Sequence, residues 1–381
     1  MDDTRKNAKT RVPRRHAERL VSLDAFRGLT IAGMILVNNP GAGHVYAPLQ
    51  HADWNGWTPT DLVFPFFLYI VGVALTLSLG ERVRCGDRRG QMIAKIARRT
   101  LIIFALGVLL NAFPYFDWDN VRIPGVLQRI ALCYCVAALL VLTTGTRGQI
   151  LAAVGLVLGY WMLMMLVPVP GHDAGSLGPG SNLGAYIDDW LLHDHLLHRR
   201  WDPEGLLSTL PAIATTLSGV LTGHWLRSAR SALERVSGMF VAGNLALLVG
   251  VVMDGWFPIN KNLWSSSFVV FTAGMALNGF AVCYWLIDIK AYRRWATPFV
   301  IYGTNPILAY VLSSLVGKTM LLWRVTLADG SKVVLRKYLM ERLFLPFARP
   351  INASLLYALA YVLFWLGVTA ILYRKRIFIK I

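Results

Sequence analysis

A histidine stands in a short polar segment between two long apolar runs of this sequence. His51 lies in the stretch QHADWNGW, where Asp53, Trp54 and Asn55 follow it closely. A histidine in such a loop is more often a solvated side chain than a reactive one. The imidazole nevertheless titrates nearest neutrality, which suits it to take a proton from an amine or to attack a thioester. The neighbouring carboxylate, indole and amide favour a reactive role, with His44 as the alternative histidine of the segment.

Two amides precede this segment at the end of the first apolar run. Asn38 and Asn39 stand directly before Pro40, so one interpretation is that they cap the C-terminus of a helix. The other is that an amide N–H donates a hydrogen bond to an oxyanion that develops on a carbonyl under attack. The sequence leaves both interpretations open.

Charged residues also fall inside the apolar runs. Asp24 and Arg27 are three residues apart and share a helix face. They either form an ion pair that anchors the helix end, or Arg27 faces an anionic cofactor that enters from the cytoplasm. Arg129 lies about two turns into a later run, and ionisable groups within membrane spans are candidates for function. We expect Arg129 to pair with Asp61 and to hold two spans together near His51.

Other polar and aromatic residues favour structural roles. Asn278 and Asn305 lie within apolar runs, where amides are typical of hydrogen bonds between helices. Tryptophans at the edges of the runs predict an interfacial belt more than a sugar-stacking platform. These tryptophans are Trp118, Trp190, Trp201, Trp256 and Trp264.

The composition places these residues in a membrane protein. Hydrophobic residues are 55% of the chain and charged residues 15%, whereas soluble domains carry about 25% charged residues. Several runs of nearly 20 residues are almost free of charge and do not alternate as barrel strands do. We therefore predict an all-α, polytopic integral membrane protein. The net charge of +17 reflects Lys and Arg in cytoplasmic loops rather than nucleic-acid binding.

About ten membrane spans are expected, with both termini in the cytoplasm. The expected spans are 22–39, 60–79, 100–113, 124–142, 149–167, 208–226, 237–253, 265–287, 298–321 and 351–372. Residues 1–19 form a basic cytoplasmic arm, and residues 20–381 form a single transmembrane domain. The outer loops are expected at about 40–59, 168–207 and 322–350, and the second of them contains a possible short helix, DDWLLHDHLLHRRW.

The loop at 322–350 departs from the charge pattern because it is basic although it is placed on the outer side. Its stretch VVLRKYLMERLFLPF has helical periodicity, which predicts an amphipathic helix in the interface, or else a misassigned span.

The cysteines predict neither a metal site nor a disulfide framework. Cys85 lies in a basic loop, and the other three lie in expected spans. Cys133 and Cys135 are two apart, so on a helix they point in nearly opposite directions.

Five segments carry a family resemblance. They are RLVSLDAFRG, LVNN, QHADWNGWTPTDLVFPFFLYIVGVAL, RIPGVLQRIALCY and WDPEGLLSTLPAI. Together they resemble the heparan-α-glucosaminide N-acetyltransferase family and its bacterial relatives, from about Arg19 to the C-terminus. LDAFRG alone is less specific, because other membrane acyltransferases carry a similar segment. The combination with HADWNG and TDLVFP is much more specific.

The resemblance implies an acetyltransferase that uses cytosolic acetyl-CoA and an amino-sugar acceptor on the far side of the membrane. His51 matches the family's active-site histidine and Asn38 its nearby asparagine, and we add Asp61 to this catalytic set. Whether His51 accepts the acetyl group or acts as a general base stays open. Cofactor contacts are expected from Asp24, Arg27, Arg82, Arg84 and Arg129, and acceptor contacts from Asp53, Trp54 and Asn55.

The acceptor and the assembly are less defined. Lysosomal members of the family carry a further N-terminal luminal region and span that this sequence does not show, so a free glucosamine-type sugar or a cell-wall amino sugar is as good a candidate as heparan. The alternative from another class is a transporter for such a sugar, although Gly and Pro interruptions lie mostly near span ends. We further expect a homodimer and a bacterial inner-membrane location.

Overall fold

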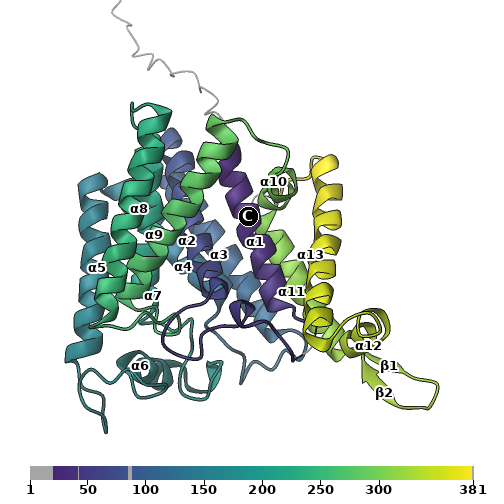
Figure 1. Cartoon of the computed structure of the whole chain (residues 1–381). Helices are drawn as coiled ribbons and strands as arrows, with labels where there is room; N and C mark the ends of the chain where they lie inside the picture. The colour runs from purple at the N-terminus through teal and green to yellow at the C-terminus, as the bar shows by residue number, and fades with distance from the viewer. Residues whose placement is uncertain (1–19, 42, 85–87, 380–381) are drawn as a thin grey trace, which may run out of the picture.

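The computed structural model describes residues 20–41, 43–84 and 88–379, which form a bundle of long helices (Figure 1). The predicted basic arm 1–19 and Cys85 lie outside the described residues. Arg82 and Arg84 belong to the last turn of a helix, but their side chains lie outside the described part of the structure.

The helices follow the apolar runs closely. In chain order they are α1 Val21–Asn38, α2 Pro59–Arg84, α3 Arg89–Ala112, α4 Val126–Thr143, α5 Thr146–Leu166, α6 Leu183–Leu192, α7 Thr209–Leu226, α8 Ala232–Asp254, α9 Ser266–Tyr284, α10 Thr297–Thr304, α11 Pro306–Leu322, α12 Leu335–Leu343 and α13 Pro350–Arg374. Local signals fix some of the helix starts. Ser231 and Glu234 form a reciprocal capping box at α8, and the Asn182 side chain caps α6.

The mostly helical fold is confirmed, its helices are apolar enough for the predicted membrane class, and the number of spans stays a prediction. Among the described residues, seven helices are long and apolar enough to cross a membrane, or eight if α10 and α11 together count as one span. Nine of the ten expected spans each coincide with one helix and 298–321 coincides with α10 and α11, but α3 and α7 do not pass that test. The placement of the termini also stays a prediction.

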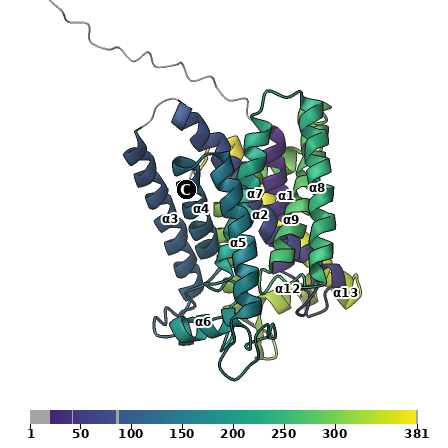
Figure 2. The same ribbon diagram turned by 90° about the vertical axis from the view of Figure 1, so that its left-hand side faces the viewer.

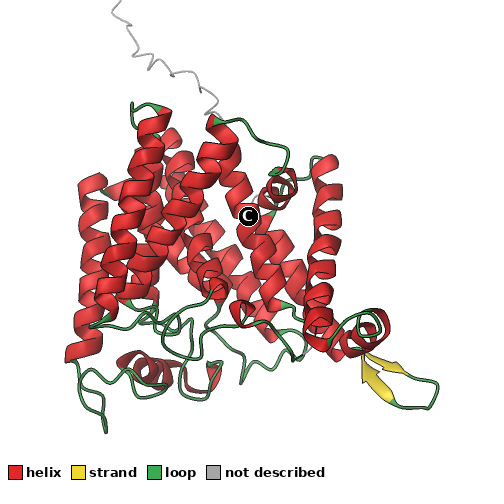
Figure 3. Cartoon of the chain, in the orientation of Figure 1, coloured by secondary structure: helices red, strands yellow, loops and turns green. Residues whose placement is uncertain are grey.

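The long connections gather at one end of the bundle, opposite the start of α1 (Figure 3). We call it the loop end. It contains residues 39–41, 43–58, 113–125, 167–208, 255–265 and 323–349.

The segment 322–350 differs in part from expectation. Its helix α12 is confirmed, but at nine residues it is far too short to be a span. Before it, β1 Arg324–Thr326 pairs antiparallel with β2 Lys332–Val334, so the chain is mostly rather than wholly α-helical.

The centre of the bundle is the crossing of α2 and α7, which lies between α3 and α4 on one side and α8 and α9 on the other (Figure 2). A Cβ atom on Gly72 would lie 1.9 Å from the Thr216 carbonyl oxygen, and one on Gly219 would lie 1.9 Å from that of Tyr69. Only glycine permits so close an approach of the two backbones, and small residues serve this purpose in membrane helix pairs.

The expected span 298–321 is broken, which corrects the prediction of a continuous helix. α10 and α11 meet at Asn305 with a bend of 85°. Pro306 lacks an N–H and disfavours helical geometry at the residue before it, which explains the break. The Asn305 side chain donates to the Ile377 carbonyl at 2.9 Å and accepts from the Ile379 N–H at 2.8 Å. The chain after α13 thus turns back onto the broken helix.

One tryptophan also departs from the predicted interfacial belt. Trp264 is 1% exposed, packs edge-on against Phe64 and donates its indole N–H to Thr215 Oγ1 at 3.1 Å. It is a core residue because its loop folds inward between α2 and α7.

Replacing Asn305 by Ala should destabilise the fold, because it removes both hydrogen bonds to the returning chain. We expect a cost of about 1–3 kcal/mol, seen as a lower apparent melting temperature in detergent. Asn244→Ala is the matched control, since that exposed amide, among the described residues, bonds only to the Phe240 carbonyl of its own helix. Equal melting temperatures for Asn305→Ala and the wild type would contradict this reading.

Candidate active site

The carboxylate of Asp61 is the centre of the polar cluster at the loop end. Asp61 lies in the first turn of α2, and its side chain is 1% exposed. Its Oδ2 accepts hydrogen bonds from the Ala52 N–H at 3.1 Å, the Thr58 N–H at 3.0 Å and the Thr58 hydroxyl at 3.1 Å. The helix N-terminus favours negative charge at this position. So many donors require an ionised carboxylate, and they fold the segment 50–58 over the start of α2.

His51 takes its orientation from this carboxylate. Its Nδ1 lies 2.6 Å from Asp61 Oδ1, whereas its side chain is 53% exposed. Since the carboxylate only accepts, Nδ1 carries the hydrogen, and the lone pair of a neutral ring is on Nε2. A histidine held in one tautomer by a buried carboxylate is an arrangement suited to a general base or a nucleophile.

Lys261 completes the cluster, and sequence reasoning missed it. Its Nζ lies 3.4 Å from Asp61 Oδ1, 2.9 Å from His51 Nδ1 and 3.3 Å from His51 Nε2. The side chain is 16% exposed, and burial lowers the pKa of Lys261 from its usual value while the Asp61 charge opposes that shift. The one signal in the sequence was a lysine in the short apolar connection FPINKNLW.

The loop 255–265 carries Lys261 to the site because it docks on the histidine segment. The Gly56 N–H donates to the Ile259 carbonyl at 2.7 Å, and Asn260 Nδ2 donates to Asn55 Oδ1 at 3.0 Å. Asn260 is fully buried and also accepts from the Leu263 N–H at 2.8 Å. Asn55, predicted as an acceptor contact, therefore has at least a docking role.

The other predicted acceptor residues have different surroundings. Trp54 donates to the Leu177 carbonyl at 3.0 Å and packs edge-on against Trp201 at 5.1 Å between ring centroids. His198 stacks on the same Trp201 ring at 4.2 Å. Asp53 is exposed and, among the described residues, makes no hydrogen bond. Their binding role stays a prediction.

The two asparagines at the end of α1 separate. Asn39 Nδ2 donates to the Ile35 carbonyl at 2.9 Å. This bond satisfies a carbonyl in the last turn of α1, so Asn39 caps the helix, as the first of the two interpretations holds. Asn38 is exposed, and within the described ranges no hydrogen bond joins it to His51. The catalytic role of Asn38 stays a prediction.

The expected pair of Asp61 and Arg129 is wrong. Arg129 Nη2 donates to the Gly205 carbonyl at 3.0 Å and to Ser208 Oγ, and its guanidinium lies 5.1 Å from the Trp264 ring centroid. The loop before α7 supplies these partners, and hydropathy did not predict that this loop covers α4. Nε and Nη1 of this fully buried guanidinium have no partner in the described part of the chain.

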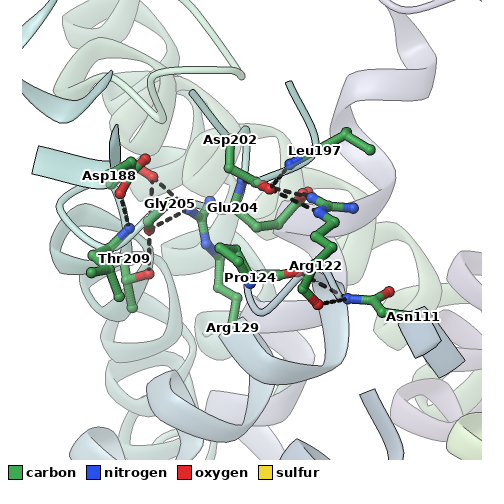
Figure 4. Close-up of polar contacts among 12 residues, drawn as sticks. Asn111, Arg122, Pro124, Arg129, Asp188, Leu197, Asp202, Glu204, Gly205 and Thr209 are labelled. Atoms are coloured by element: carbon green, nitrogen blue, oxygen red, sulfur yellow. Dashed lines mark hydrogen bonds and ion pairs between the residues drawn. The ribbon is translucent and has the colours of Figure 1, made fainter. Parts of the chain in front are cut away.

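A second charged network ties down this loop (Figure 4). Arg122 binds Asp202 through Nε at 2.8 Å and Nη2 at 2.6 Å, and it also contacts Glu204. Asp202 accepts from the Leu197 N–H at 2.8 Å and the Glu204 N–H at 2.9 Å. The contact is bidentate and the Asp202 carboxylate is buried, so this pair fixes the loop before α7 rather than offering a free cation.

The predicted ion pair of Asp24 and Arg27 is confirmed, with 3.1 Å between Oδ1 and Nη1. Arg27 also donates to the Gly303 carbonyl at 3.2 Å, which joins α1 to α10. This pair lies toward the start of α1, away from the loop end (Figure 1). Contact of either residue with a cofactor stays a prediction.

The described residues offer no set of metal ligands. Among the described residues, no group of three or more His, Cys, Asp or Glu side chains could hold a metal ion.

Comparison with known proteins then identifies the family. Residues 19–253 match the model of the heparan-alpha-glucosaminide N-acetyltransferase catalytic region. The chain belongs to the heparan-alpha-glucosaminide N-acetyltransferase family. It is 33% identical to the human and 32% identical to the mouse heparan-alpha-glucosaminide N-acetyltransferase, over 77% and 78% of this chain. It spans about half the length of these relatives, 52% and 54%, and the family match includes the whole His51 segment and Asp61.

The buried carboxyl of Asp188 in α6, at the loop end, predicts a pH dependence of stability. Burial raises the pKa of Asp188 to about 7 from 3.8, although the Leu206 N–H bonds its Oδ1 at 2.8 Å. A raised folded-state pKa stabilises fully below the unfolded value and loses that contribution as pH rises through the folded value. Thermal stability should therefore gain a falling component between about pH 4 and 7.

Asp188→Asn should remove this component, and melting curves across that pH range measure it. Asp173→Asn, at an exposed carboxyl of the same end, is the control. A pH profile that is the same for Asp188→Asn and the wild type would contradict the burial argument.

Proposed function

We propose that this protein transfers an acetyl group from acetyl-CoA to the amine of an amino sugar, with the chemistry at the His51 cluster. The observation that carries this proposal is the hydrogen bond of a half-exposed imidazole to a buried carboxylate, within a family whose relatives are named N-acetyltransferases. An ionised Asp61 stabilises the positive charge that His51 gains during either route of transfer.

The donor comes from the opposite end of the bundle in this proposal. The nucleotide and its phosphates lie toward the start of α1, where Arg27 is the described candidate for a phosphate contact. Arg82, Arg84, Arg88 and Arg89 are the further basic candidates that the sequence offers on this side. Arg27 already bonds to Asp24 and to the α10 backbone, so it acts from a fixed position. The acyl arm extends through the bundle to His51, and we place the start of α1 in the cytoplasm.

The transfer has two possible orders. His51 Nε2 attacks the thioester carbonyl and releases the CoA thiolate, and the acceptor amine then takes the acetyl group from the imidazole. Alternatively, His51 takes a proton from the amine as that amine attacks the thioester directly. Asn38 polarises the carbonyl, while Asp53, Trp54 and Asn55 hold the sugar, and the Trp54 and Trp201 rings give it an aromatic surface.

The acceptor lies on the far side of the membrane, which we assign to the periplasm of a bacterial inner membrane, with a homodimer as the proposed assembly. A free glucosamine-type sugar is the first acceptor to test. The transporter alternative gains no support from the broken helix, because the returning C-terminal segment occupies the Asn305 amide.

His51→Ala should abolish transfer while acetyl-CoA still binds. Loss of a positioned base typically costs about 10²- to 10⁴-fold in rate. The measurement is thioester turnover with glucosamine by protein in detergent, together with isothermal titration of acetyl-CoA.

His44→Ala is the matched control, because that histidine belongs to the same loop and has no contact with Asp61 among the described residues. Labelled acetyl-CoA without acceptor separates the two orders, since only the first leaves label on the protein. Full turnover by His51→Ala would rule out the proposed site.

A further inference from the structure

Lys261 places a cation beside the His51 imidazole. Its Nζ lies 3.3 Å from His51 Nε2 and 2.9 Å from Nδ1. Because Nδ1 already donates to Asp61, it offers no lone pair to the ammonium. The nearly equal distances to both ring nitrogens place Nζ beside the ring rather than in line with either nitrogen. The ammonium therefore has N–H donors left over for another acceptor.

The Asp61 charge has a cationic partner other than the imidazole. The buried Asp61 carboxylate carries one negative charge, and Lys261 at 3.4 Å from its Oδ1 carries the compensating positive charge. With the carboxylate already matched, the ring need not be protonated to satisfy it. Nε2 then keeps the lone pair that attack on a carbonyl or removal of a proton requires.

The backbone holds Lys261 in place independently of His51. Asn260, the residue before it, is fully buried between the Asn55 side chain and the Leu263 N–H. Trp264, three residues after Lys261, is buried and donates its indole N–H to Thr215 Oγ1. A donor fixed on both sides in this way needs little rearrangement during a reaction, which is the condition for strong electrostatic stabilisation.

We propose that Lys261 is a catalytic residue whose ammonium donates a hydrogen bond to the oxyanion formed when the thioester carbonyl is attacked beside His51 Nε2. This inference rests on the proposed acetyl transfer. It adds a residue from the connection between α8 and α9 to a site that the sequence placed entirely between α1 and α2.

The step balances without any further reactant. The attacking lone pair, from Nε2 or from the acceptor amine, forms a bond to the carbonyl carbon, and the C=O π pair moves onto oxygen, where Lys261 stabilises it. The pair returns to re-form C=O as the carbon–sulfur bond breaks and the CoA thiolate leaves. In the direct order, His51 Nε2 accepts the proton that the amine loses. In the other order, the acetylated imidazolium gives its acetyl group to the amine, and the freed Nε2 accepts the proton that the amine loses.

The test compares Lys261→Met, which lacks charge and donor, with Lys261→Gln, which keeps an N–H donor without the charge. We expect Lys261→Met to lower kcat by about 10²- to 10³-fold, the usual loss for one oxyanion donor, with a smaller loss for Lys261→Gln. KM and the Kd for acetyl-CoA should change little, because the interaction forms only in the transition state.

Controls separate this inference from the proposed function. Lys290→Met, at an exposed lysine that lies against Trp285 just after α9, should retain wild-type kcat. Lys261 is overturned as a catalytic residue if the wild type is active, His51→Ala is inactive and either folded Lys261 variant keeps kcat within about threefold of wild type. If Lys261→Met does not fold, Lys261→Gln decides by the same criterion. A folded wild type without turnover would overturn the acetyl-transfer proposal, and Lys261 with it.

Discussion

A carboxylate that is almost completely buried at the first turn of a membrane helix must be matched by donors, and the Asp61 carboxylate sets the geometry of the whole loop end. Its two oxygens draw in backbone N–H groups of the segment 50–58, the His51 imidazole and the Lys261 ammonium. An unpaired charge in this position would cost several kcal/mol, so these groups have little freedom to lie elsewhere. The His51 imidazole is positioned as a consequence of satisfying one buried charge.

The rest of the loop end supports this cluster from outside. The bidentate contact of Arg122 with Asp202 holds the segment before α7, and Trp201 next to it packs on Trp54 of the histidine segment. Beneath them, Trp264 lies between Phe64 of α2 and the Arg129 guanidinium. At the other end, Arg27 joins α1 to α10 through Asp24 and Gly303. Two separate polar regions at opposite ends are the arrangement that the proposed transfer across a membrane requires.

The sequence predicted what depends on local pattern and missed what depends on distant packing. Hydropathy placed the helices well, and the spacing of Asp24 and Arg27 gave a contact that exists. His51 and Asp61 were both chosen as site residues, yet their contact was not foreseen because Asp61 was assigned to Arg129. An ion pair between two spans would have satisfied both charges inside the membrane. The partners of Asp61 and Arg129 come instead from the loops. Lys261 is 210 positions from His51, and no local periodicity connects them. The break at Asn305 was signalled only by the following proline.

The most direct test of the central claim is a structure of this protein with a ketone analogue of acetyl-CoA. In this analogue a methylene group separates the sulfur from the carbonyl, so the acyl group cannot be transferred. The account predicts the nucleotide near the start of α1 and the analogue's carbonyl carbon in contact with His51 Nε2. Its carbonyl oxygen should lie within hydrogen-bond distance of Lys261 Nζ. An analogue bound with its nucleotide at the loop end, or with its carbonyl away from His51, would contradict the account.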